Sequence, residues 1–127
     1  MRFLSMIKMD ESKPFGEPPM SLYAAIAEFG EQAMKDGTLL EQGGLLPSAS
    51  GALIRLADGK VTVIDGPFTE AKELIGGYAM FQARSKEEAV QQAKRFMDLH
   101  AEHWPGAEAV CEVRQVMDPA DFEPNAG

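Results

Sequence analysis

Hydrophobic and polar residues alternate along several short stretches of the chain, and each of these predicts a β-strand, in which side chains point alternately to opposite faces. Four stretches share this pattern: residues 2–9, 38–42, 75–84 and 109–117. Two further strands, 52–56 and 60–64, flank Asp58-Gly59, a pair typical of the two-residue turn of a β-hairpin. The prolines and glycines of 11–19 and 43–51 predict loops.

Two longer segments repeat their apolar residues every three or four positions, and this spacing predicts amphipathic α-helices. The apolar face of the first helix consists of Leu22, Ile26, Phe29 and Ala33. Asp36-Gly37 ends this helix, because glycine suits the left-handed position after a helix. The second helix starts at Ser85, which forms a capping box with Glu88, and ends before Pro105. The residues expected to be buried on it are Ala89, Ala93, Phe96, Met97 and His100.

The order of these elements predicts an α+β fold of the ferredoxin-like type. Without the hairpin the chain reads as a β-α-β unit used twice, (βαβ)2, with an antiparallel sheet. Residues 1–117 form this single domain, and 118–127 form a C-terminal tail. Two helices cover only one face of the sheet. The other face carries either Ala109, Cys111, Val113 and Met117 or Val110 and Val116, so we expect a homodimer whose sheets face each other.

Composition supports a soluble globular protein and narrows its partners. The chain has 127 residues, a net charge of −8 and 45% hydrophobic residues. The negative charge argues against binding to nucleic acid or to acidic membrane surfaces. The first 13 residues lack the apolar run of a signal peptide or a membrane helix. The single cysteine, Cys111, has no partner for an internal disulfide, so we expect a cytoplasmic protein.

Asp65 is the leading candidate for chemistry, and two interpretations of it stay open. It follows the strand 60–64 and precedes Gly66-Pro67. Its carboxylate can accept N–H groups of the residues after the turn, which stabilises a turn by roughly 1 kcal/mol. Alternatively it projects into a cleft as a general base or as an anchor for a ligand. Phe68 likewise either covers the core or forms a wall of a site.

Other patterns argue against metal and cofactor chemistry. His100 and His103 are three residues apart on a helix and have no third ligand in sequence reach. The chain has no Cys-x-x-Cys pair, phosphate-binding glycine loop or dinucleotide fingerprint. We therefore expect no metal and no cofactor. Ser48 and Ser50 have no identifiable histidine base, which argues against a serine nucleophile.

Three stretches carry a resemblance to a known family: GLLPSASGALIRLADGKVTVIDGPFTEAKELIGGY, SKEEAVQQAKRF and EVRQVMDPADF. With them the chain resembles the YCII-related proteins, and within these the DGPF subgroup. The resemblance implies a dimeric α/β barrel of ferredoxin-like subunits. It also implies a pocket near the dimer interface, where the broader family has a proposed His-Asp pair. This chain has no histidine before residue 100 and has Leu46 where the subgroup often has Gln or His, so the early histidine has no counterpart.

The preferred functional hypothesis is a cleft near the dimer interface that binds or transforms a small molecule. Asp65 would be its acid-base or anchoring group. The residues expected to bind the ligand are Glu41, Ser48, Phe68, Glu70, Lys72 and Tyr78. One alternative is a non-catalytic dimeric sensor or regulatory module, linked to sigma-factor-dependent transcription. Another is that the Asp-Gly-Pro-Phe segment only stabilises the dimer. Whether the protein is an enzyme stays open.

Overall fold

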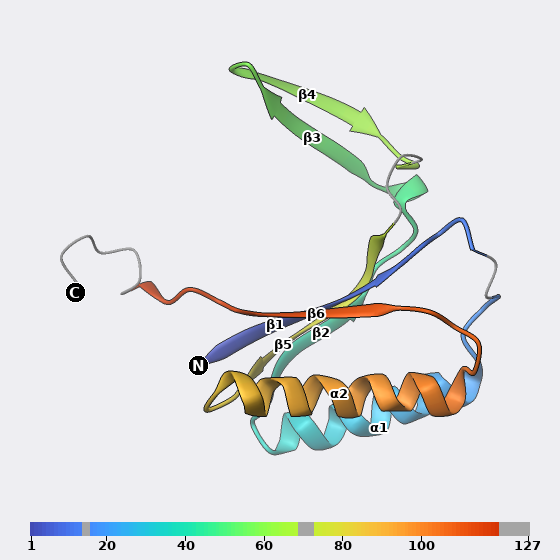
Figure 1. The fold of residues 1–127 in the computed structure, drawn as a ribbon, viewed down its shortest axis with the longest axis vertical. Helices are drawn as coiled ribbons and strands as arrows, with labels where there is room; N and C mark the ends of the chain where they lie inside the picture. The colour runs from blue at the N-terminus through green and yellow to red at the C-terminus, as the bar shows by residue number, and fades with distance from the viewer. Residues whose placement is uncertain (14–15, 69–72, 120–127) are drawn as a thin grey trace.

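The computed structural model describes residues 1–13, 16–68 and 73–119, and its elements follow the predicted order (Figure 1). The strands are β1 (Arg2–Met9), β2 (Leu39–Gly44), β3 (Ala52–Ala57), β4 (Lys60–Asp65), β5 (Leu74–Gln82) and β6 (Val110–Gln115). The helices are α1 (Met20–Lys35), the short 3-10 helix η1 (Ser48–Ser50) and α2 (Lys86–His103). Several strand boundaries differ from the predicted ones by one or two residues, and β2 continues through Gly43 and Gly44, where a loop was predicted. These two glycines pair with β5 and so extend the strand.

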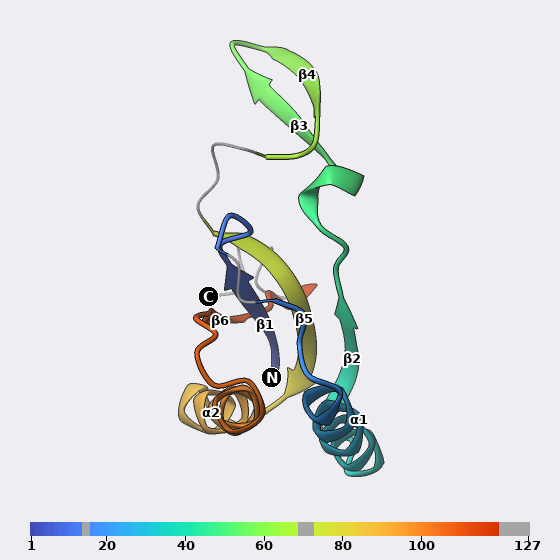
Figure 2. The same ribbon diagram turned by 90° about the vertical axis from the view of Figure 1, so that its right-hand side faces the viewer.

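Four strands form one sheet in the order β2-β5-β1-β6, and every neighbouring pair is antiparallel. Both helices lie on the same face of this sheet (Figures 1 and 2). This arrangement confirms the ferredoxin-like fold. The core lies between the sheet and the helices, where Phe3 and Phe81 stack with ring centroids 6.1 Å apart. The other buried apolar residues are Leu22, Ala33, Leu39, Ala83, Ala89 and Ala93.

Local signals in the sequence act as predicted at three turns. Gly37 has a φ of 76°, and the hairpin turn residues Asp58 and Gly59 have φ angles of 52° and 74°, as the predicted hairpin turn requires. Ser85 caps α2, because its Oγ accepts the N–H of Glu88 at 3.1 Å. The carboxylate of Glu88 accepts from Nε of Arg84 at 3.0 Å, so Glu88 pairs with the residue that comes just before the cap.

The face of the sheet that carries no helix is called here the outer face. In β6, Val113 pairs with the buried Ser5, so Val113 and Cys111 point to the helices while Val110 points outward. The alternative that placed Cys111 and Val113 on the outer face is therefore wrong. The apolar side chains at the centre of the outer face are Leu4, Met6, Tyr78 and Met80, as the register of β1 with β5 requires. No helix of the described residues covers them, and the predicted dimer stays a prediction.

Strands β3 and β4 form a separate two-stranded sheet that extends away from the body (Figures 1 and 2). All six residues of β3 and all six residues of β4 are exposed. The hairpin predicted from Asp58-Gly59 is thus confirmed. That it stands apart from the main sheet was not predicted.

Candidate functional site

The sheet leaves a hollow under the two helices, because two of its positions there carry no side chain. Gly44 of β2 pairs with Gly77 of β5, and a Cβ built at Gly44 would meet no atom within 4 Å. The resulting cavity, called here the glycine-floored cavity, has a volume of about 550 Å³. This volume lies within the range of pockets that hold small organic ligands, roughly 300–1,000 Å³.

The lining of this cavity is apolar with a few polar atoms. Its main walls are Ile7, Leu22, Ile26, Phe96 and Trp104. The polar residues that line it are Ser5, Tyr23, Gln42, Tyr78 and His100, and of these Tyr78 points its side chain to the outer face. No Lys, Arg, Asp or Glu is among the residues that line it in the described part of the chain. A charged ligand would lose its hydration there without gaining an opposite charge, so this cavity suits an uncharged molecule.

His100 is the polar residue of the cavity whose orientation the structure defines best. Its Nδ1 lies 3.0 Å from the carbonyl oxygen of Phe96, and its ring makes an edge-to-face contact with the Phe96 ring at 5.0 Å. Because a carbonyl only accepts, the neutral ring carries its proton on Nδ1. Nε2 is then left as a hydrogen-bond acceptor, and it has no partner among the residues that the structure describes.

Asp65 lies elsewhere, at the end of β4, where it is exposed and pairs with Ala52. The cap predicted for its carboxylate is not formed by the first residues of the turn. The N–H of Gly66 donates to the carbonyl of Gly51 at 2.9 Å, and the N–H of Phe68 donates to Oγ of Ser48 at 3.1 Å. Asp65 does not line the glycine-floored cavity. Its role as an acid-base or anchoring group stays a prediction.

Ser48 is buried and joins three segments of the chain. Its Oγ donates to Oε2 of Glu11 at 2.7 Å, and its N–H donates to Oε1 of the same carboxylate at 2.8 Å. Its Oγ also accepts the N–H of Phe68. The described hydrogen bonds of Ser48 therefore hold the loop after β2, the loop after β1 and the turn after β4 together. The role of Glu11 was not predicted, because nothing in its local sequence indicates a partner 37 residues away.

Glu41 and Tyr78, both predicted to bind a ligand, contact each other. The Tyr78 hydroxyl donates to Oε1 of Glu41 at 3.1 Å, and the two residues belong to neighbouring strands. This hydrogen bond to a carboxylate raises the pKa of Tyr78, since ionisation of the phenol would remove the donor and place two negative charges together.

Replacing Glu41 by Gln is expected to lower the pKa of Tyr78, because the amide carries no charge to oppose the phenolate. The chain has two tyrosines, so the titration is followed by ultraviolet absorbance in a Tyr23→Phe background, where Tyr78 alone ionises. Glu28→Gln on α1 serves as a charge-matched control. An unchanged Tyr78 pKa in Glu41→Gln would show that the contact is absent in solution.

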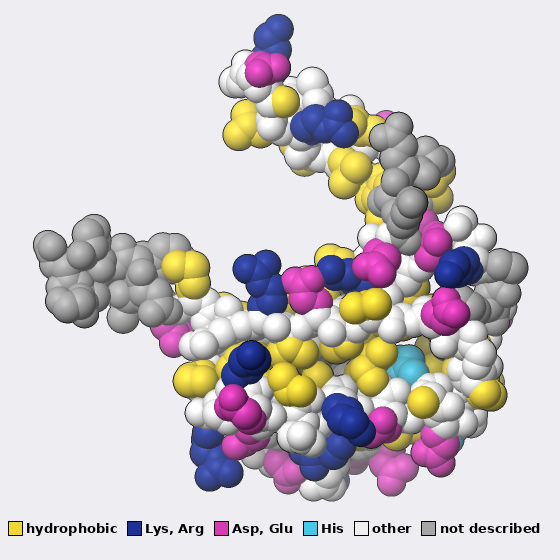
Figure 3. Space-filling model, viewed as in Figure 1, with side chains coloured by type: hydrophobic (Ala, Val, Ile, Leu, Met, Phe, Trp, Pro, Cys, Tyr) yellow, Lys and Arg dark blue, Asp and Glu magenta, His cyan; other side chains and the backbone are white. Residues whose placement is uncertain are grey.

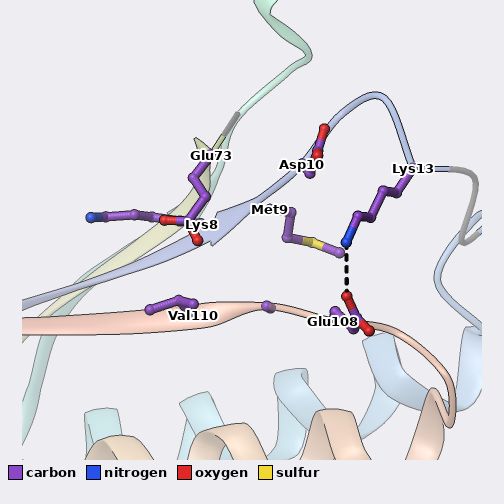
Figure 4. Close-up of a pocket in the computed structure, with 8 residues that line it drawn as sticks. Lys8, Met9, Asp10, Lys13, Glu73, Glu108 and Val110 are labelled. Carbon is purple, nitrogen blue, oxygen red and sulfur yellow. Dashed lines mark hydrogen bonds and ion pairs between the residues drawn. The ribbon is translucent and has the colours of Figure 1, made fainter. Parts of the chain in front are cut away.

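A smaller hollow of about 250 Å³ lies between the ends of β1 and β6 (Figure 4). Nζ of Lys13 reaches Oε2 of Glu108 across it at 3.0 Å, whereas Lys8 extends away from it and pairs with Glu112 at 2.6 Å. These hydrogen bonds raise the pKa of both lysines. Each lysine thus has a carboxylate partner within the chain, which makes this hollow a weaker candidate for an anionic ligand.

Two of the predicted ligand-binding residues, Glu70 and Lys72, lie outside the described residues. Phe68 is half-buried, and its ring is close enough that a Cβ on Gly51 would lie 3.5 Å from it. Of the predicted site residues that are described, Tyr78 alone lines the glycine-floored cavity. The sequence signal for this cavity was the pair of Gly-Gly steps at 43–44 and 76–77, whose pairing only the register reveals.

Within 1–13, 16–68 and 73–119, no group of three or more His, Cys, Asp or Glu residues is arranged to hold a metal ion. Neither helix in this part of the chain has the length and apolar character needed to cross a membrane. Comparison with protein families matches residues 1–118 to the YCII-related domain. This match is to the family as a whole, so the DGPF subgroup stays a prediction. A search of curated proteins found no match.

Proposed function

This chain belongs to the YCII-related family, and we propose that it binds an uncharged, mainly apolar small molecule in the glycine-floored cavity. The observation that carries this proposal is the hollow of about 550 Å³ that the pairing of Gly44 with Gly77 leaves beneath the helices. A cavity of this size, with aromatic walls and a few polar atoms, has the composition of small-molecule sites in other proteins.

His100 is the residue proposed to orient the ligand. The bond from Nδ1 to Phe96 holds the ring in one tautomer, and the free Nε2 accepts a hydroxyl or amide proton from the ligand. A net hydrogen bond of this kind is worth about 1 kcal/mol. The indole N–H of Trp104, another lining residue, supplies a donor for a carbonyl or ether oxygen.

The proposal is tested with two neutral probes, 4-tert-butylcyclohexanol and its methyl ether, of which only the alcohol can donate a hydrogen bond. Trp104 is the single tryptophan of the chain and lines the cavity, so its fluorescence reports occupancy. We expect saturable binding of both probes to the native chain, with the alcohol bound about fivefold more tightly, as about 1 kcal/mol implies.

Three variants locate the binding. Gly44→Leu places a side chain in the hollow and is expected to abolish the signal, whereas Gln91→Leu adds the same side chain at an exposed position of α2 and should not. His100→Phe keeps the aromatic contact and is expected to remove the preference for the alcohol. Equal binding by the native chain and Gly44→Leu would contradict the proposal.

Asp65→Asn separates this proposal from the hypothesis that Asp65 is the anchoring or acid-base group. Because Asp65 does not line the cavity, probe binding is expected to be unchanged. Loss of binding in Asp65→Asn, with the native fold retained, would move the site to the turn after β4. A ligand that binds without being transformed would favour the non-catalytic sensor over an enzyme.

A further inference from the structure

Gln42 is a polar residue of β2 on the face of the sheet that the helices cover. It pairs with Ala79 of β5, and Ala79 pairs with Ser5 of β1, so these three residues form one row across the sheet. The row on one side of them contains the stacked aromatic pair of the core, and the row on the other side contains Gly44 and Gly77. Gln42 therefore lies where the packed core ends and the glycine-floored cavity begins, and it is one of the residues that line this cavity.

The carboxamide of Gln42 rests against the backbone of α1 at Gly30. A Cβ built at Gly30 would overlap Nε2 of Gln42 and would lie 3.2 Å from its Cδ and 3.4 Å from its Oε1. The amide thus occupies the space that any other residue at position 30 would fill. Glycine inside a helix is unfavourable relative to alanine, because it loses more backbone freedom on folding. Gly30 is buried inside α1, so helix stability does not explain its presence, whereas the room that it leaves for Gln42 does.

The carboxamide of Gln42 makes no hydrogen bond with the residues that the structure describes. Gln42 is nevertheless exposed, although it touches α1, so its side chain borders open space and not a fully packed interior. An amide can donate two hydrogen bonds and accept two. The described chain uses none of those that this side chain offers, which leaves them available to a molecule in the cavity.

The lining of the cavity determines which ligand group suits this carboxamide. No charged side chain of the described residues lines the cavity, so a charged group beside Gln42 would lose its hydration without gaining an opposite charge. A ketone or ether oxygen would engage only Nε2 and would leave Oε1 without a donor. A group with neighbouring N–H and C=O accepts from Nε2 and donates to Oε1 at once, so both polar atoms of the side chain are paired.

We propose that the ligand of the glycine-floored cavity carries an amide-type group, a primary carboxamide or a lactam, which pairs with the carboxamide of Gln42. This inference rests on the proposed function, because it requires the same cavity to be occupied. Gly30 is a positioning residue, since the absence of a Cβ there fixes where the Gln42 amide stands. The rest of the ligand is apolar and lies against Phe96 and Trp104, in the layer of apolar side chains between the sheet and the helices (Figure 3).

Two probes of the same shape test this pairing: 4-tert-butylcyclohexanecarboxamide and the methyl ketone in which CH3 replaces its NH2 group. The ketone keeps the acceptor and loses both N–H donors. The fluorescence of Trp104 reports the binding of each probe, and the ratio of amide affinity to ketone affinity is compared between variants. Gln42→Leu is expected to lower this ratio at least about fivefold, the effect of one lost hydrogen bond. Gln91→Leu, the same substitution at an exposed position of α2, should leave the ratio unchanged.

Gly30→Ala tests the position of the Gln42 amide while Gln42 itself is kept. The three atoms nearest to the added Cβ all belong to the flexible end of the Gln42 side chain, so the fold is expected to be retained, with a Tm no lower than that of the native chain. The affinity ratio is expected to fall as in Gln42→Leu. Added to Gln42→Leu, the same substitution should lower the ratio no further, because no amide is left to displace.

The outcomes separate this inference from the proposed function. If neither probe binds to the native chain, both are overturned. If both probes bind and the affinity ratio is the same in the native chain and in Gln42→Leu, the pairing with Gln42 is overturned, while the cavity stands as the binding site. An unchanged ratio in Gly30→Ala would overturn the positioning role of Gly30.

Discussion

Replacing Phe81 by Ala is expected to lower the free energy of unfolding by about 3–5 kcal/mol, the usual cost of removing a large buried side chain. Phe81 is 3% exposed and stacks on Phe3 at 6.1 Å in the centre of the core. In Phe81→Ala the strands cannot close fully around the cavity that the lost ring leaves. Residue 81 is held by pairing with Phe3 on one side and with Leu39 on the other. Since small domains are stable by only about 5–15 kcal/mol, this variant should approach the limit of folding.

The measurement for Phe81→Ala is urea-induced unfolding followed by circular dichroism. Met20→Ala is the control, because Met20 is a large apolar residue that is 80% exposed. Its loss is expected to change the free energy of unfolding by no more than about 0.5 kcal/mol. A loss below about 1 kcal/mol for Phe81→Ala would contradict the core described above.

Replacing Gly66 by Ala is expected to separate the turn after β4 from the loop after β2. We expect this to lower the free energy of unfolding by about 2–3 kcal/mol. A Cβ at Gly66 would overlap the carbonyl oxygen of Ser48 and would lie 3.2 Å from Cα of Ala49. Both obstacles are backbone atoms that a change of rotamer cannot move. Relief therefore requires the two segments to part, which breaks the bond from the Phe68 N–H to Ser48.

Amide hydrogen exchange at positions 66 and 68 reports this separation, because these N–H groups donate across the two segments, to the carbonyl of Gly51 and to Oγ of Ser48. Faster exchange at both positions is expected in Gly66→Ala. Gly44→Ala serves as the control, since a Cβ there meets no atom within 4 Å. Native exchange rates in Gly66→Ala would show that the turn does not pack against Ser48 in solution.

Features that depend on a few adjacent residues were predictable from the sequence. Asp58-Gly59 made the hairpin turn, Ser85 capped α2, and Gly37 took the left-handed conformation after α1. Each of these is decided by backbone sterics or by a hydrogen bond within four residues. The order of strands and helices then allowed few arrangements, and the ferredoxin-like sheet followed from it.

The candidate site was much less predictable, because its parts meet only through strand register and loop packing. One of the two interpretations of Asp65 made it the cap of its own turn, yet the N–H groups of Gly66 and Phe68 donate to other segments. The glycine-floored cavity exists because Gly44 pairs with Gly77. A shift of one position in that register would move the glycines to the other face of the sheet.

By itself, the sequence determined the elements, their order and the presence of one sheet face without helices. Hydrophobic periodicity and helix caps depend on neighbouring residues, and the order of the elements limits the topologies that they can form. Only the tertiary structure decided that Val110 and not Cys111 points outward, that Ser48 binds Glu11, and that the hairpin stands apart from the main sheet. These outcomes depend on contacts between residues far apart in the chain. Such contacts are selected by the packing of the whole domain and leave no signal in any single segment.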